Sequence, residues 1–81
     1  SMTHTVSLLV ENHEGVLSRI ARLFDSRGYR LESLITSPAP DDDANRITLT
    51  VSGARGALEK VEKQLEKFID VIHLEVKLRD S

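Results

Sequence analysis

A polar turn near the start of the chain carries the most informative combination of residues. An apolar stretch ends at Val10, polar residues follow, and Gly15 lies where an amphipathic helix begins. Backbone N–H groups and the positive end of a helix dipole would converge at this turn. The arrangement suits a small anion such as an amino-acid carboxylate. It also suits an ordinary turn, because Asn12 favours local backbone hydrogen bonds and Gly15 permits unusual dihedral angles.

The remaining polar residues lack the spacing of catalytic or metal sites. His4, His13 and His73 show no HxH or HExxH pattern, so we expect no metal site, although His13 lies in the turn and could contact a ligand. The acidic run 41–43 lacks the glycine and distal glutamate of a calcium loop, and a solvated hairpin tip explains it. The sequence contains no P-loop, GxGxxG or Gly-x-Ser-x-Gly motif. We therefore expect no catalytic residue and no cofactor.

Length and composition restrict the class of protein. The 81 residues are expected to form one small domain over 1–81. Ser1 precedes Met2, and we interpret it as a cloning remnant. A core of this size is modest and there is no cysteine to reinforce it, so we expect a homodimer or larger assembly. The net charge of −2 argues against nucleic-acid binding. The sequence shows neither a membrane span nor a signal-peptide core, and the expected location is the cytoplasm.

The elements that must position the turn follow from apolar periodicity. Alternation predicts strands over residues 5–10, 30–37, 46–52 and 71–79. Helical spacing predicts helices over 16–27 and 57–69, and Gly28 is expected to cap the first. A Pro- and Asp-containing loop separates the second and third strands, which are expected to form a long hairpin.

The expected direction of the apolar side chains can be stated for each strand. Leu31 and Ile35 are expected to face the core, and Leu34 the opposite side. In the last strand Ile72 is expected to point inward and Val71 outward. The expected second face of the sheet is mixed in polarity and carries Ser7, Leu9, Leu34, Thr48, Thr50, Val71 and His73.

The order strand, helix, strand, strand, helix, strand gives two halves of similar length. Right-handed crossovers then predict an α+β protein with the ferredoxin-like βαββαβ fold, a four-stranded antiparallel sheet with both helices on one face. RNA-binding modules share this fold, but they stack bases on aromatic residues of the sheet. Phe24, Tyr29 and Phe68 are the only aromatic residues here, and both phenylalanines fit core positions. Fold alone therefore does not decide the function.

Three blocks of the sequence resemble a known family. Residues 8–19 (LLVENHEGVLSR) are similar to the opening of an ACT domain. Residues 23–34 (LFDSRGYRLESL) and 63–71 (KQLEKFIDV) resemble the regulatory, or small, subunit of acetolactate synthase. The blocks agree in order and spacing, and the resemblance covers nearly the whole chain.

The resemblance implies a regulatory rather than a catalytic role. Such subunits bind valine or another branched-chain amino acid as a feedback inhibitor and raise the activity of a separate thiamine-diphosphate-dependent catalytic subunit. ACT domains pair side by side by joining their sheets, and ligands lie between the two copies. The turn of one copy and the start of the second strand of the other form the family's pocket. The implied ligand-binding residues of this chain are Asn12, His13, Glu14, Gly15, Val16, Leu17, Arg30 and Leu31.

Two departures from the family pattern leave alternatives open. Arg30 follows Gly28-Tyr29 where the family usually has asparagine; it could pair with a ligand carboxylate or fill the pocket. The rival to an amino-acid sensor is therefore a ligand-blind module that activates or assembles the catalytic subunit, and an independent enzyme such as a small phosphatase ranks behind both. The chain also ends where family members carry an additional C-terminal domain, so it is expected to be a naturally short form or an excised domain.

Overall fold

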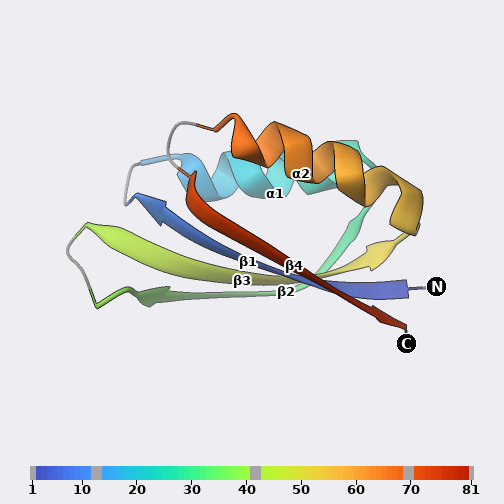
Figure 1. The fold of residues 1–81 in the computed structure, drawn as a ribbon, viewed down its shortest axis with the longest axis horizontal. Helices are drawn as coiled ribbons and strands as arrows, with labels where there is room; N and C mark the ends of the chain where they lie inside the picture. The colour runs from blue at the N-terminus through green and yellow to red at the C-terminus, as the bar shows by residue number, and fades with distance from the viewer. Residues whose placement is uncertain (1, 12–13, 41–42, 69–70, 81) are drawn as a thin grey trace.

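The computed structural model describes residues 2–11, 14–40, 43–68 and 71–80. The strands are β1 (Met2–Glu11), β2 (Arg30–Pro38), β3 (Ala44–Gly53) and β4 (Val71–Asp80), and the helices are α1 (Val16–Ser26) and α2 (Leu58–Glu66), the latter preceded by the 3₁₀ turn η1 (Arg55–Ala57). The strands form one antiparallel sheet in the order β2-β3-β1-β4. Both helices cover the same face of this sheet (Figure 1). The predicted ferredoxin-like fold is confirmed.

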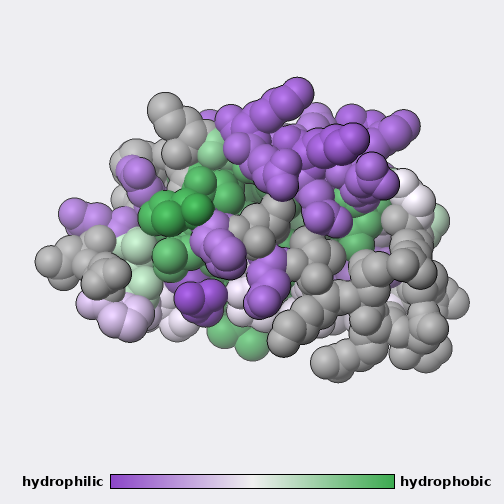
Figure 2. Space-filling view, viewed as in Figure 1, coloured by the Kyte–Doolittle hydropathy of each residue, from purple (hydrophilic) through white to green (hydrophobic). Residues whose placement is uncertain are grey.

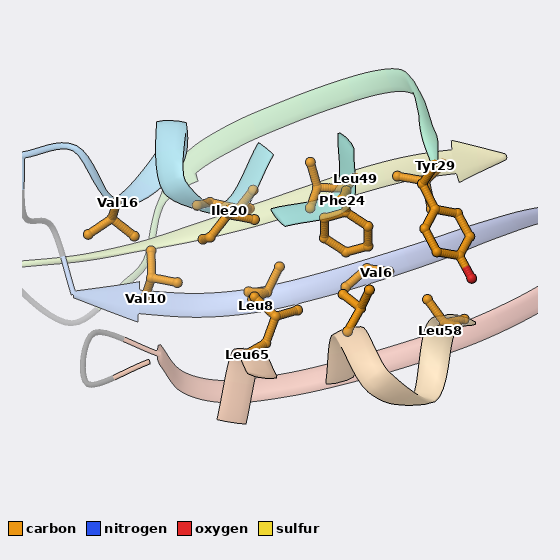
Figure 3. Packing of buried hydrophobic residues seen from close by; sticks show 13 residues of the cluster. Val6, Leu8, Val10, Val16, Ile20, Phe24, Tyr29, Leu49, Leu58 and Leu65 are labelled. Carbon is orange, nitrogen blue, oxygen red and sulfur yellow. The ribbon is translucent and has the colours of Figure 1, made fainter. Parts of the chain in front are cut away.

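The core lies between the helices and the covered face of the sheet (Figure 3). Alternate residues of β1 and β3 point into it, as predicted, because a strand turns every second side chain to one face. The helices contribute residues three or four positions apart. Burying each of these side chains stabilises the fold by about 1.5–3 kcal/mol. The buried apolar residues are Val6, Leu8, Val10, Val16, Ile20, Phe24, Tyr29, Ile47, Leu49, Val51, Leu58, Val61 and Leu65.

The direction predicted for β2 was partly wrong. A register shift between Leu31 and Ser33 places Leu34 opposite the buried Leu49, and Leu34 packs against the core. Ile35 pairs with Thr48 on the open face and is 63% exposed. Leu31 pairs with the buried Val51, on the predicted side, but at the sheet edge it remains 40% exposed. The extra residue of a bulge reverses the alternation that the sequence pattern assumes.

A second bulge overturns the prediction for the start of β4. The register of β4 with β1 shifts between Leu9 and Val10, so that Val71 lies opposite the buried Val10. Val71 consequently packs against the core, whereas Ile72 is 54% exposed. The space-filling view shows an apolar patch where β4 begins, below the hydrophilic surface of the helices (Figure 2).

Gly28 ends α1 as predicted, and Tyr29 anchors the chain that follows. Gly28 has a φ of +82°, its N–H donates to the Asp25 carbonyl, and the Tyr29 N–H donates to the Phe24 carbonyl. These two bonds form a Schellman motif. The Tyr29 ring packs edge-on against Phe24 and His4, with ring centroids 6.1 and 6.0 Å apart, and its hydroxyl donates to the Ala54 carbonyl.

His4 is a fully buried polar residue that the periodicity of the strand did not identify as core. Its Nε2 donates to the Gly53 carbonyl at 3.2 Å, whereas Nδ1 has no hydrogen-bond partner. His4 therefore extends the inward face of β1 beyond Val6 and ties the start of β1 to the end of β3.

Gly53→Ala should destabilise the protein because the Tyr29 ring occupies the space beside Gly53. A Cβ at this position would lie 2.6 Å from Tyr29 Cδ1. We expect a loss of about 1–3 kcal/mol in the free energy of unfolding, measured by urea denaturation. Gly56→Ala is the matched control, since no atom lies within 4 Å of its Cβ position, and it should change stability by less than about 0.5 kcal/mol. Equal effects of the two substitutions would contradict the close packing.

Burial raises the pKa of the Tyr29 phenol above its ordinary value of 10.0 because desolvation disfavours the phenolate. The folded pKa exceeds the unfolded one, so this contribution to stability is present below pH 10 and is lost as the pH rises through the folded pKa. Tyr29 is the only tyrosine and there is no tryptophan, so ultraviolet absorbance follows its titration directly. Tyr29→Phe should lose stability less steeply above pH 10 than the unsubstituted chain; parallel losses would contradict the assignment.

Candidate functional site

The turn between β1 and α1 leads into a helix whose first N–H groups have no partner within the helix. Gly15 is the N-cap residue of α1 with a φ of +84°, and the helix has neither a side-chain cap nor an acidic residue in its first turn. The first backbone hydrogen bond of the helix runs from the Arg19 N–H to the Gly15 carbonyl, at 3.1 Å. The N–H groups that precede Arg19 in the helix have no partner within it and carry the positive end of its dipole. An anion is the ligand that such a terminus favours.

Part of the predicted turn can be placed and part cannot. Glu14 and Gly15 are exposed, Leu17 is exposed beside them, and Val16 is buried beneath. Asn12 and His13, both predicted to bind ligand, lie outside the described residues.

A small groove of about 160 Å³ adjoins this turn. Two of the predicted site residues, Val16 and Leu17, line it. The other lining residues were not named by the sequence analysis and come from three strands: Val10 and Glu11 from β1, Thr36 from β2, and Asn45 and Ile47 from β3. Their proximity depends on the pairing Thr36–Ile47 and Val10–Asn45, so the strand register was the signal needed to find them.

The second part of the predicted site, Arg30 and Leu31, lies elsewhere in the same chain. Both residues line a larger groove of about 530 Å³ between α1 and the start of β2, together with Ser18, Ala21, Arg22, Asp25 and Tyr29. Gly15 precedes α1 and Arg30 follows it. The 11 residues of α1 separate them by about 16 Å along the helix axis. A single chain therefore does not bring the predicted residues together.

The guanidinium of Arg30 lies near a carboxylate on the surface. Arg30 Nε lies 3.6 Å from Glu32 Oε2, and Ser52 Oγ donates to the same oxygen at 2.8 Å. Ser52 is the register partner of Arg30 and follows the buried Val51, so its side chain points to the open face of the sheet. The Arg30 side chain is 82% exposed. Its cation therefore lies on the open side, paired with Glu32, and does not fill the groove.

The part of the chain that the structure describes holds no group of three or more His, Cys, Asp or Glu side chains suited to a metal ion. Among the same residues, no helix is long and apolar enough to cross a membrane. The smaller groove has aliphatic walls from Val10, Val16, Leu17 and Ile47, and the larger one carries the charged residues Arg22, Asp25 and Arg30.

Comparison with known proteins identifies one family. The family model described as an AHAS small subunit-like ACT domain matches residues 6–73. The chain is 46% identical over 79 residues to the acetolactate synthase small subunit of Mycobacterium avium, covering 98% of this chain and 47% of that protein. It is 42% identical over 73 residues to the acetolactate synthase isozyme 3 small subunit of Escherichia coli K12, covering 90% of this chain and 45% of that protein.

Solved structures agree with this relationship. The acetolactate synthase small subunit from Thermotoga maritima superposes with a TM-score of 0.78 at 31% identity, covering 91% of this chain and 46% of that one. The C-terminal domain of the MgtC protein from Mycobacterium tuberculosis reaches a TM-score of 0.79 at 18% identity, covering 98% of this chain and 88% of that one, a likeness of fold alone. The chain spans about half the length of the curated small subunits that it matches. From the family model and these relatives, the chain belongs to the family of acetolactate synthase small subunit-like ACT domains.

Proposed function

We propose that this chain is the ACT-domain part of a regulatory subunit of acetolactate synthase. It binds valine or another branched-chain amino acid between two copies of itself. It modulates a separate, thiamine-diphosphate-dependent catalytic subunit in the cytoplasm and performs no catalysis of its own. Its family and the names of its relatives support this role.

The observation that carries the proposal is the division of the predicted site between the two ends of α1. β2 lies at an edge of the sheet, and all of its residues except Leu34 are exposed. If two β2 strands pair antiparallel about a two-fold axis, the start of one strand lies beside the end of the other. Thr36, near the end of β2, lines the groove at the Gly15 turn. Arg30 and Leu31 of a second copy would then complete that groove.

The residues around the turn suit an aliphatic amino acid. Its carboxylate would accept hydrogen bonds from the backbone N–H groups that follow Gly15. Its side chain would contact Val16, Leu17 and Ile47, which line the adjoining groove. We place Asn12, His13 and Glu14 at the same site, with the partner copy's Arg30 and Leu31 as the opposite wall.

Regulation would follow from the position of the ligand between two copies. A ligand that binds one dimer geometry more tightly than another shifts the population toward that geometry. A catalytic subunit bound elsewhere on the domain would respond to this shift.

The alternative function is a ligand-blind module that activates or assembles the catalytic subunit, and Arg30 is the residue that favours it. Its cation lies on the open side of the sheet, 3.6 Å from the Glu32 carboxylate, which is a competitor for any ligand carboxylate. Co-purification with and activation of the catalytic subunit, with no response to any amino acid, would support this alternative.

Calorimetric titration with valine, leucine and isoleucine tests the sensor role. We expect saturable heat with at least one of them, and a rise in melting temperature at millimolar ligand because binding to the folded state stabilises it. Lysine serves as the control, since its charged side chain does not suit the apolar wall. Neither heat nor a thermal shift with any branched-chain amino acid would exclude the sensor role.

Gly15→Asp should weaken binding of the responding amino acid by about tenfold or more, because the new carboxylate would oppose the ligand's carboxylate at the turn. Gly15→Asn is the matched control. It introduces a side chain of nearly the same size at the same φ of +84°, and therefore a similar backbone strain, but it adds no negative charge. Equal affinities in the two variants would contradict a carboxylate bound at this turn.

A further inference from the structure

A third groove lies between the two helices, and we refer to it as the interhelical groove. Its volume is about 350 Å³. Because α1 packs against β2 and α2 against β4, the groove runs over the helical layer and not along the β2 edge (Figure 1). Its lining residues are Arg19, Arg22, Leu23 and Ser26 of α1, Gln64 of α2, and Phe68 just after α2. The four from α1 stand at positions i, i+3, i+4 and i+7, which share one face of a helix.

The interhelical groove combines an apolar floor with a cationic rim. Leu23 and Phe68 are partly buried and pack against the core, whereas Arg19 and Arg22 are exposed. The Arg19 guanidinium lies 5.4 Å from the centroid of the Phe68 ring, a cation–π contact that keeps the charge above the floor. Among the described residues, no Asp or Glu lines the groove. The groove is therefore locally cationic, although the chain carries a net charge of −2.

Arg27 fixes the direction of the Gln64 amide at the edge of this groove. Its Nε and Nη2 both donate to Gln64 Oε1, at 3.1 and 2.9 Å. The amide oxygen is thus occupied, and the NH2 group of Gln64 is the part of the amide left to meet a ligand. The polar groups that line the groove are therefore mainly hydrogen-bond donors, namely two guanidinium groups and one amide NH2.

We propose that the interhelical groove binds a segment of the catalytic subunit in which an apolar side chain is flanked by Asp or Glu. The apolar side chain would cover Leu23 and Phe68. The carboxylates would accept charge-assisted hydrogen bonds from Arg19 and Arg22, and a further hydrogen bond from Gln64. The inference rests on the proposed function and adds the surface through which the domain meets its partner.

An acidic segment of another protein fits this groove better than a second copy or a free amino acid. A second copy docked groove to groove about a two-fold axis would bring arginines against arginines. A free amino acid would place its ammonium group beside two guanidinium groups, with no carboxylate from the described lining to receive it. The dimer in the proposed function joins the β2 edges, so it leaves the groove between α1 and α2 open to a further partner.

The groove begins one helical turn from the proposed amino-acid site. The Arg19 N–H donates to the Gly15 carbonyl at 3.1 Å, and the Arg19 side chain lies over Phe68. A displacement of the start of α1 would therefore move a cation of the groove relative to its floor. Binding of an amino acid at the turn and binding of the catalytic subunit in the groove would then change each other's affinity by the same factor.

Opposite charges at Ser26 test the proposal on the full 81-residue chain. Ser26 is exposed, and its hydroxyl donates to the Leu23 carbonyl at 2.7 Å. Ser26→Glu and Ser26→Lys both remove this bond and add a long side chain, but they differ in the sign of the charge. The dissociation constant for the catalytic subunit, measured by biolayer interferometry, should rise about tenfold or more with Ser26→Glu. With Ser26→Lys it should stay within about threefold of the unsubstituted value.

Arg19→Met provides a second variant, which removes the charge but keeps an unbranched side chain that can lie over Phe68. It should raise the same dissociation constant about threefold or more. Lys60→Met on α2 is the matched control, because it removes a cation from an exposed residue outside the groove, and it should leave the constant unchanged. Circular dichroism should show all four variants folded.

Equal affinities of the two Ser26 variants, with Arg19→Met indistinguishable from Lys60→Met, would overturn the docking surface and leave the proposed function intact. Sedimentation velocity and valine calorimetry on Ser26→Glu separate the other occupants. Weakened dimers would assign the groove to a second copy, and loss of valine heat with intact dimers would assign it to the amino acid; either result would overturn the inference. An unsubstituted chain that does not bind the catalytic subunit would overturn the proposed function as well.

Discussion

The packing around Tyr29 is the contact on which the placement of the rest depends. The Schellman motif turns the chain sharply out of α1, and the Tyr29 ring then fills the space between Phe24, His4 and Gly53. Its hydroxyl reaches the carbonyl of Ala54, just past the end of β3. The end of α1, the start of β1 and the end of β3 are thereby joined at one point. β2 leaves this point at the sheet edge, directly beneath α1.

Two bulges then decide which apolar residues the sheet leaves exposed. An extra residue near Glu32 brings Leu34 over the core and turns Ile35 to the open face. A second irregularity places Val71 inside and Ile72 outside. Bulges are common at sheet edges, and both lie on edge strands of this sheet. The two edge strands, β2 and β4, therefore carry exposed apolar side chains beside backbone groups that no strand of the same chain pairs with. An edge strand with these features can pair with the sheet of another chain.

The division of the candidate site follows from the length of α1. Backbone donors for an anion lie at the N-terminus of the helix, and Arg30 and Leu31 follow its C-terminus. No rearrangement of side chains could bring these groups together within one chain, because a rigid helix separates them. Ligand binding that uses both ends must then be coupled to association, and such coupling is one way in which a small domain can transmit a signal.

The sequence by itself determined the order of the elements, the inward residues of β1 and β3, the capping of α1 by Gly28 and the position of the β1–α1 turn. These features depend on periodicity and turn chemistry, which act over a few neighbouring residues. The tertiary structure decided the faces of Leu34, Ile35, Val71 and Ile72, the burial of His4, and the groove that Thr36, Asn45 and Ile47 line beside the turn. It also placed the Glu32 carboxylate 3.6 Å from Arg30. These features depend on the register between neighbouring strands, which is fixed by the packing of residues distant in sequence. A single bulge shifts that register by one residue and so turns the following side chains to the opposite face of the sheet.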